Sequence, residues 1–184
     1  MDHGEMYRTA EGFYFAMHLL KRRTIGEAKA TLKKLPFKVI GPTDRLWAPQ
    51  FALQAFALEL YFKALLQREN GSLPKDGHDL QKLFQNLKDP TQAAIKYEYE
   101  NCPNESAMQR AAMAESGFPV DFDSCLQISK DAFVKQRYIY EHSEWPDVIL
   151  EDILGAVRAY IYGNYADWMY SLPPIDMRVP PISD

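Results

Sequence analysis

The chain has few of the residues and motifs that mark several large classes of protein. Its 184 residues include only two cysteines, Cys102 and Cys125, and four scattered histidines, with no CxxC pair. We therefore expect free thiols rather than a disulfide, no metal site and no cofactor. No apolar run reaches the roughly 18 residues of a membrane span. A glycine-rich loop of the kind that cradles phosphates is also missing from the sequence.

A signal peptide is not evident either, because residues 1–5 provide no basic region followed by an apolar one. We therefore expect a cytoplasmic protein. The net charge of −4 argues against a dedicated nucleic-acid coat protein, since such domains are usually basic. The charge is uneven, however, because residues 1–45 hold nine Lys or Arg against five acids. This segment is either a set of solvated helix faces or a basic flank that attracts phosphate.

Apolar spacing and helix-breaking residues predict a chain made of helices. The expected helices cover residues 6–23, 24–35, 47–69, 78–87, 89–99, 105–115, 121–143 and 148–170. Asp89, Asp121 or Asp123, and Asp147 are the expected N-caps. With no strand-like alternation, the predicted fold is an all-α, antiparallel up-and-down bundle. Residues 1–45 would pack on a bundle formed by 46–171, followed by a proline-rich tail over 172–184.

Residues 47–69 form the strongest predicted helix, and apolar residues surround it on nearly all sides, which is typical of a central, buried helix. Glu59 and Lys63 stand four apart with the acid first, the favourable order for an ion pair. They form either a structural pair at the edge of the core or part of a functional site. Further along the chain, His78 is either a proton carrier or, with Asp79, the cap of the next helix.

The segment from Arg137 to His142 combines a permanent cation with a group that moves protons near pH 7. Both capabilities are needed to cleave an RNA phosphodiester. Residues five apart on a regular helix point about 140° away from each other, so the two converge only where the helix ends or distorts. In the alternative interpretation Arg137 pairs with Glu141, Tyr138 packs against the protein, and His142 faces the helix dipole.

Taken together, these stretches resemble the HEPN family of small helical bundles, which occur in toxin–antitoxin and defence systems. The resemblance covers residues 49–170 and rests on three features: the helix with Glu59 and Lys63, the Gly-His-Asp-Leu turn at 77–80, and the Arg-x4-His motif. It implies a homodimer in which two such motifs form a metal-independent ribonuclease. Arg137 would then hold the phosphate and His142 would move the proton.

Residues 137–141 read Arg-Tyr-Ile-Tyr-Glu and match an aromatic-rich RYxYE string of one branch of this family. Tyr138 stands where catalytic members usually carry a polar residue. Our leading hypothesis is a homodimeric protein that acts on or binds RNA, as the toxin paired with a cognate antitoxin. The alternative is a non-catalytic helical dimer that binds a nucleotide or a partner such as a nucleotidyltransferase. The late tyrosines, at 160, 162, 165 and 170, either stack bases or pack in the core or interface.

Overall fold

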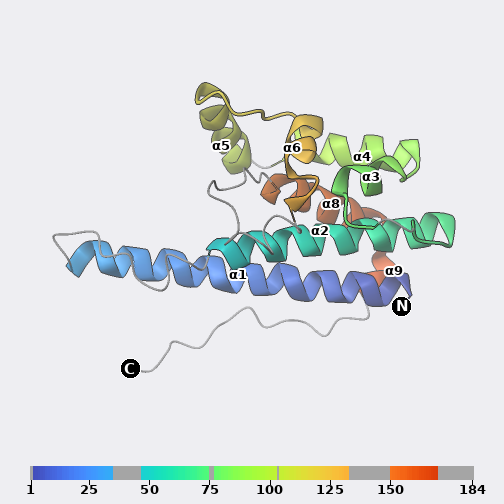
Figure 1. The fold of residues 1–184 in the computed structure, drawn as a ribbon, viewed down its shortest axis with the longest axis horizontal. Helices are drawn as coiled ribbons and strands as arrows, with labels where there is room; N and C mark the ends of the chain where they lie inside the picture. Colours follow the sequence, from blue (N-terminus) through green and yellow to red (C-terminus); the bar gives the residue numbers. More distant parts are fainter. Residues whose placement is uncertain (1, 35–46, 75–76, 103, 133–149, 170–184) are drawn as a thin grey trace.

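The computed structural model describes residues 2–34, 47–74, 77–102, 104–132 and 150–169, and these residues form an all-α fold (Figure 1). Within these ranges there is no strand, and no helix is long and apolar enough to cross a membrane. The helices are α1 (His3–Lys34), α2 (Trp47–Asn70), α3 (Leu80–Gln85), α4 (Asp89–Glu100), α5 (Asn104–Glu115), α6 (Phe122–Ser129), α8 (Glu151–Asn164) and α9 (Ala166–Met169). The all-α prediction is therefore confirmed.

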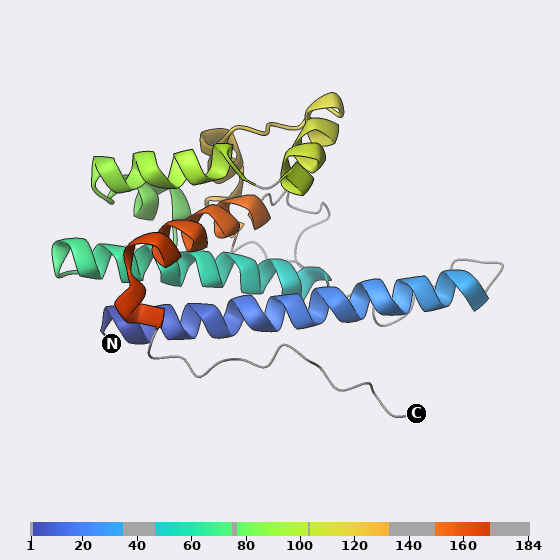
Figure 2. The ribbon, with the colours of Figure 1, turned by 180° about the vertical axis from the view of Figure 1, so that it is seen from behind.

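The first two helices pack side by side over much of their length and run in opposite directions (Figures 1 and 2). The sequence predicted two helices before residue 36, and this prediction was wrong, because α1 continues from His3 to Lys34. No proline lies between these ends, and the isolated Gly12 and Gly26 only lower helix propensity without ending a helix. The long α1 therefore provides an extended partner surface for α2.

The interior of the protein is built around α2, as the sequence predicted. The α2 helix contributes ten buried residues to the core or its polar contacts: Gln54, Ala55, Ala57, Leu58, Glu59, Tyr61, Phe62, Ala64, Leu65 and Leu66. A helix with buried residues on nearly every side has neighbours around it. Those neighbours are α1, α3 and α8, which all contact α2.

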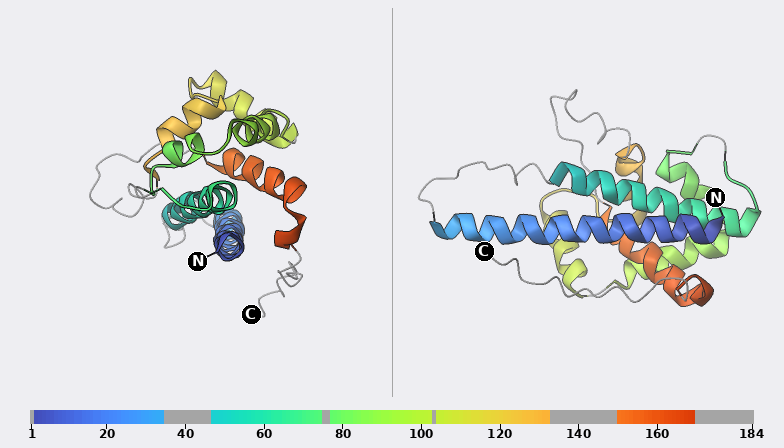
Figure 3. Two further views of the ribbon diagram at one scale, coloured as in Figure 1. Left: turned by 90° about the vertical axis from the view of Figure 1, so that its right-hand side faces the viewer. Right: turned by 90° about the horizontal axis from the view of Figure 1, so that it is seen from below.

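A second layer formed by α3, α4 and α6 lies over α2, and α8 lies between α2 and α4 (Figures 2 and 3). Aromatic rings join this layer to α2. Phe84 lies 5.7 Å from Phe62 and 4.8 Å from Phe122, measured between ring centroids, and Tyr99 meets Phe122 edge-on at 5.4 Å. The α5 helix projects away from this body (Figure 1). These ring contacts therefore hold α3, α6 and α4 together against α2.

Two predicted boundaries in the second layer differ from the structure. The N-cap of α4 is Lys88, so Asp89 is the first helical residue, where its charge favours the helix dipole. The helix capped by Asp121 ends at Ser129 rather than near residue 143. Just beyond it, the carbonyl of Lys130 accepts a hydrogen bond at 3.0 Å from the backbone N–H of Leu80. This long-range bond ties the end of α6 to the start of α3 and could not be read from local sequence.

The last predicted helix is also interrupted. Asp147, its predicted cap, lies outside the described residues, and α8 ends at Asn164 before the short α9 begins at Ala166. Tyr165, between the two, leaves the helical conformation, and its ring stacks on Trp168 at 4.6 Å between centroids. Trp168 in turn packs on Tyr7 of α1 at 5.3 Å. The break thus folds α9 back onto the first turns of α1.

We expect Leu58→Ala to destabilise the protein by about 2–5 kcal/mol, the usual cost of an unfilled core cavity. Leu58 is fully buried, whereas Leu60, on the same helix, is only partly buried and serves as the matched control. Leu60→Ala should therefore cost clearly less. Chemical denaturation of the two variants measures the difference, and equal losses would show that the core around α2 is misplaced.

Candidate functional site

The four predicted site residues Arg137, Tyr138, Glu141 and His142 lie outside the described residues. Their proposed roles in holding phosphate and moving protons therefore stay predictions. The other four, Glu59, Lys63, His78 and Asp79, lie on or between α2 and α3. The candidate site is built from these.

The structure brings Glu59, Lys63 and His78 together around one carboxylate. Glu59 is only 1% exposed, and its Oε1 atom lies 2.6 Å from Lys63 Nζ. His78 reaches the same carboxylate from the chain before α3, with Nδ1 at 3.1 Å from both carboxylate oxygens. The predicted Glu59–Lys63 pair is thus confirmed as a contact. A buried carboxylate needs such partners, because an isolated charge is costly to remove from water.

Gly77 and Asp79 support this cluster in different ways. A Cβ atom added at Gly77 would lie 3.0 Å from Lys63 Cε and 3.1 Å from Nζ, so a larger residue would have to displace the lysine. Asp79 is the N-cap of α3, because its carboxylate accepts a 3.0 Å hydrogen bond from the backbone N–H of Lys82. The capping interpretation is therefore confirmed for Asp79. It belongs to the start of α3 and is not bonded to Glu59.

The chemistry available at this cluster is proton transfer and anion binding. His78 remains 61% exposed while one ring nitrogen is held by a buried carboxylate. Such a carboxylate fixes the orientation of an imidazole and so decides which of its ring nitrogens faces solvent. Lys63 adds a positive charge that is 18% exposed. The Glu59 carboxylate thus holds one ammonium group, of Lys63, and one largely exposed imidazole, of His78.

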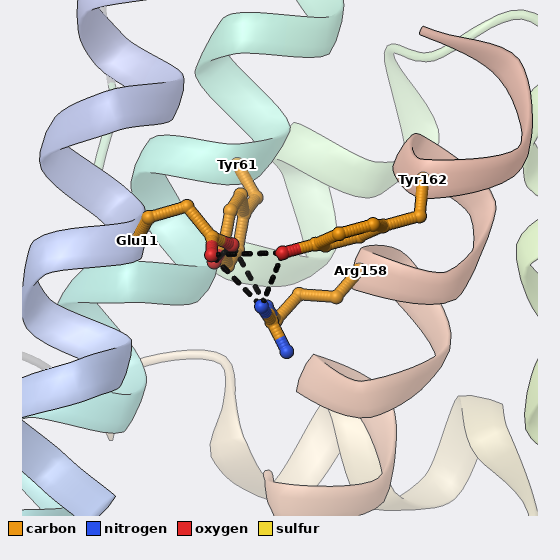
Figure 4. Close-up of polar contacts among 4 residues, drawn as sticks. All are labelled: Glu11, Tyr61, Arg158 and Tyr162. Atoms are coloured by element: carbon orange, nitrogen blue, oxygen red, sulfur yellow. Dashed lines mark hydrogen bonds and ion pairs between the residues drawn. The ribbon is translucent and has the colours of Figure 1, made fainter. Parts of the chain in front are cut away.

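A second polar cluster, which was not predicted, joins α1, α2 and α8 around Glu11 (Figure 4). Arg158 donates two hydrogen bonds to the Glu11 carboxylate, from Nε and Nη2, each at 2.8 Å. Tyr61 donates a further hydrogen bond to Glu11, and Tyr162 does so at 3.2 Å. The only sequence signal was Arg158, a single charge in the apolar stretch that follows Asp152, whereas Glu11 lies close to other charged residues of α1. Their pairing depends on how α8 packs against α1.

The electrostatics of the Glu11 cluster keep its charges fixed. Burial opposes the charged form of Arg158, but its hydrogen bonds to Glu11 raise the pKa of the guanidinium above the ordinary value. Burial, together with the Glu11 charge, raises the pKa of Tyr61. Arg158 therefore stays protonated and Tyr61 stays neutral at physiological pH. A bidentate pair of this kind is also geometrically specific, because both nitrogens must meet both oxygens.

Beside the Glu11 cluster lies a cleft of about 690 Å³ over the outer face of α8, which we name the α8 cleft. Its lining comes from α1, α8 and the C-terminal end of α4, and comprises Tyr14, Glu98, Asn101, Cys102, Glu151, Asp152, Gly155, Ala156, Arg158, Ala159 and Tyr162. Its volume lies within the range of small-molecule sites.

Most of the late aromatic residues pack in the protein. Trp168 is buried and Tyr160 and Tyr165 are partly buried against the core, whereas Tyr162 is 40% exposed at the α8 cleft. Tyr170 lies outside the described residues. Both cysteines are free thiols, as predicted. In the described part of the chain, no group of three or more His, Cys, Asp or Glu is placed to hold a metal ion.

Comparison with protein-family models, with curated proteins and with solved structures found no match for this chain. The functional argument therefore depends on the residues themselves, namely the Glu59 and Glu11 clusters and the α8 cleft.

We expect Glu11→Ala to destabilise the protein by about 3–5 kcal/mol, because it leaves the partly buried Arg158 without its counter-charge. Tyr162→Phe, the control, removes one hydroxyl from the same cluster and should cost about 1 kcal/mol. Thermal and denaturant unfolding would measure both. A loss below about 1 kcal/mol for Glu11→Ala would contradict a structural role for the pair.

Proposed function

We propose that this protein is a HEPN-like antiparallel helical bundle that acts on RNA as a homodimer. The all-α architecture and the buried α2 with its Glu59–Lys63 pair support the proposal, because the resemblance depends on that helix. The observation that carries it is the contact between His78 and Glu59. It joins, in one cluster, two segments that the resemblance had singled out separately.

The proposed reaction uses side chains of the protein to move protons and hold charge. Arg137 would bind the scissile phosphate and stabilise negative charge on its oxygens. His142 would take the proton from the attacking 2′-hydroxyl or return one to the leaving oxygen. His78, oriented by Glu59, is a candidate for the second of these proton transfers. The assignment of roles follows the resemblance for Arg137 and His142 and the described geometry for His78.

A second candidate is the non-catalytic dimer that binds a nucleotide or a protein partner. The observation that favours it is the pairing of cations across the described surface. Arg110 binds Asp152 at 3.0 Å, Lys96 binds Asp123 at 2.7 Å, and Lys21 binds Glu151. Paired cations bind phosphate less strongly than free ones, because the neighbouring carboxylate must be displaced or tolerated.

If the protein is a ribonuclease, it should cleave single-stranded RNA in the presence of EDTA, because the proposed steps use only arginine and histidine. Arg137→Ala should abolish cleavage. Arg137→Lys should not fully restore it, since the lysine ammonium cannot form the paired hydrogen bonds that a planar guanidinium makes to phosphate. His142→Ala and His78→Gln should each reduce the rate by about 100-fold or more. Gel analysis of a labelled RNA measures these rates, with His3→Ala as the histidine control.

The variants must keep the circular dichroism spectrum and unfolding midpoint of the parent for these rates to be compared. The proposed reaction fails if Arg137→Ala unfolds the protein while His142→Ala cleaves like the parent. Arg137 would then be a structural partner of Glu141, and the non-catalytic dimer becomes the better account. RNA binding that persists without cleavage would also favour that second candidate.

We expect the protein to be a two-fold homodimer, since the resembling family builds its site between two copies and symmetric dimers are the commonest oligomers. Analytical ultracentrifugation at tens of micromolar protein, a range set by typical micromolar affinities, should give about twice the chain mass. A monomer across this range would rule out a site shared between two copies.

A further inference from the structure

We infer that the α8 cleft binds the base of an RNA nucleotide, and that its lining selects guanine. The choice of an RNA base as ligand rests on the proposed function, whereas the site itself lies apart from the Glu59 cluster. Three features of the cleft carry the inference: an open floor on α8, a fixed hydrogen-bond donor at Arg158, and a carboxylate acceptor at Glu98.

The floor of the cleft is formed by α8 at the exposed Gly155 and Ala159 and the buried Ala156. Gly155 lies inside a 14-residue helix, where glycine is less stable than alanine. A Cβ atom added there meets no atom within 4 Å, so no packing inside the described chain requires the glycine. Small residues on a helix let a flat group approach the backbone closely. The space above Gly155 is therefore suited to a planar ring.

Arg158 forms one wall of the cleft and is held in place before any ligand arrives. Its Nε and Nη2 atoms bond Glu11, and Nη2 also bonds Tyr162 at 2.9 Å. The guanidinium carbon lies 3.7 Å from the centre of the Tyr14 ring and 5.0 Å from that of Tyr162. The remaining nitrogen, Nη1, points away from Glu11 (Figure 4). A donor fixed in this way loses little conformational entropy on binding an acceptor.

Glu98 forms the opposite wall, on α4. The two helices run in opposite directions, because Thr91 near the start of α4 contacts Tyr160 near the end of α8 at 3.2 Å. Glu98, two turns beyond Thr91, therefore lies across from the first half of α8, where Gly155 lies. Within the described residues, Glu98 makes no ion pair or hydrogen bond. The cleft thus has an acceptor wall at Glu98 and a donor wall at Arg158.

Among the bases, guanine matches this pair of walls best. Its N1–H and N2 amino groups are adjacent donors that one carboxylate accepts together, and its O6 and N7 atoms accept hydrogen bonds from a guanidinium. Adenine offers no such pair of adjacent donors, and recognition of unstacked RNA bases by these edges is common. The other carboxylates of the cleft are already paired, Glu151 with Lys21 and Asp152 with Arg110.

The test is calorimetric titration of the full-length protein with guanosine monophosphate and adenosine monophosphate. We expect guanosine monophosphate to bind more tightly. Glu98→Gln should weaken its binding by roughly tenfold or more, because a carboxylate pairing with two donors is lost, while adenosine monophosphate binding changes little. Gly155→Leu should remove binding of both by filling the cleft.

Two control variants separate these effects from general changes. Gly163→Leu makes the same exchange on α8, again with no atom within 4 Å of the added Cβ, but outside the cleft lining. Glu100→Gln makes the same exchange as Glu98→Gln on an exposed residue of α4 that does not line the cleft. Both should bind guanosine monophosphate like the parent. All variants should keep the parent's unfolding midpoint or exceed it.

The inference is overturned if the parent binds neither nucleotide at millimolar concentration, or if Gly155→Leu binds as the parent does. Binding of a short lysine-rich peptide in place of the nucleotides would instead identify the cleft as a protein-docking site. If Gly155→Leu and Glu98→Gln leave an observed RNA cleavage and nucleotide binding unchanged, the base site fails and the proposed function stands. If the protein binds the nucleotides but neither cleaves nor binds RNA, the base site stands and the proposed function fails.

Discussion

The relative placement of α1, α2 and α8 depends on the hydrogen bonds that the buried Glu11 carboxylate accepts. It accepts hydrogen bonds from Tyr61 of α2 and from Arg158 and Tyr162 of α8 while being only 6% exposed itself. Apolar packing alone tolerates small sliding and rotation of helices, whereas a bidentate ion pair fixes both. Since α8 forms the floor of the cleft, the same contact also fixes one wall of it. Stability and the shape of the candidate binding surface therefore have a common origin.

The protein buries a second carboxylate, Glu59, in a different way. The Glu11 partners belong to the bundle interior, whereas the Glu59 carboxylate is held by Lys63 and by His78, whose side chain is largely exposed. A buried charge is costly to remove from water, so a buried carboxylate that holds an exposed imidazole suggests a role beyond stability. This contrast is the physical reason for giving His78, rather than a member of the Glu11 cluster, a part in the proposed reaction.

The sequence predicted the helical class, the central α2, the Glu59–Lys63 contact and the cap at Asp79, because each depends on spacing within one helix or turn. It failed where distant parts of the chain decide the outcome. The early end of α6 follows a backbone bond from Leu80, and the break at Tyr165 accompanies its stacking on Trp168. Glu11 and Arg158 are 147 positions apart, and no local pattern links them. The contact of His78 with Glu59 likewise required the fold.

The central claim is that the protein acts on RNA with His78, held by the buried Glu59, as one of its proton carriers. The most direct measurement is a two-dimensional NMR titration of the labelled protein with a short single-stranded RNA that carries non-cleavable 2′-methoxy groups. The account predicts that the signals of Gly77, His78 and the Lys63 side chain shift together and saturate, and that high salt weakens the effect. Unchanged signals at these residues, while other parts of the protein respond to RNA, would contradict it.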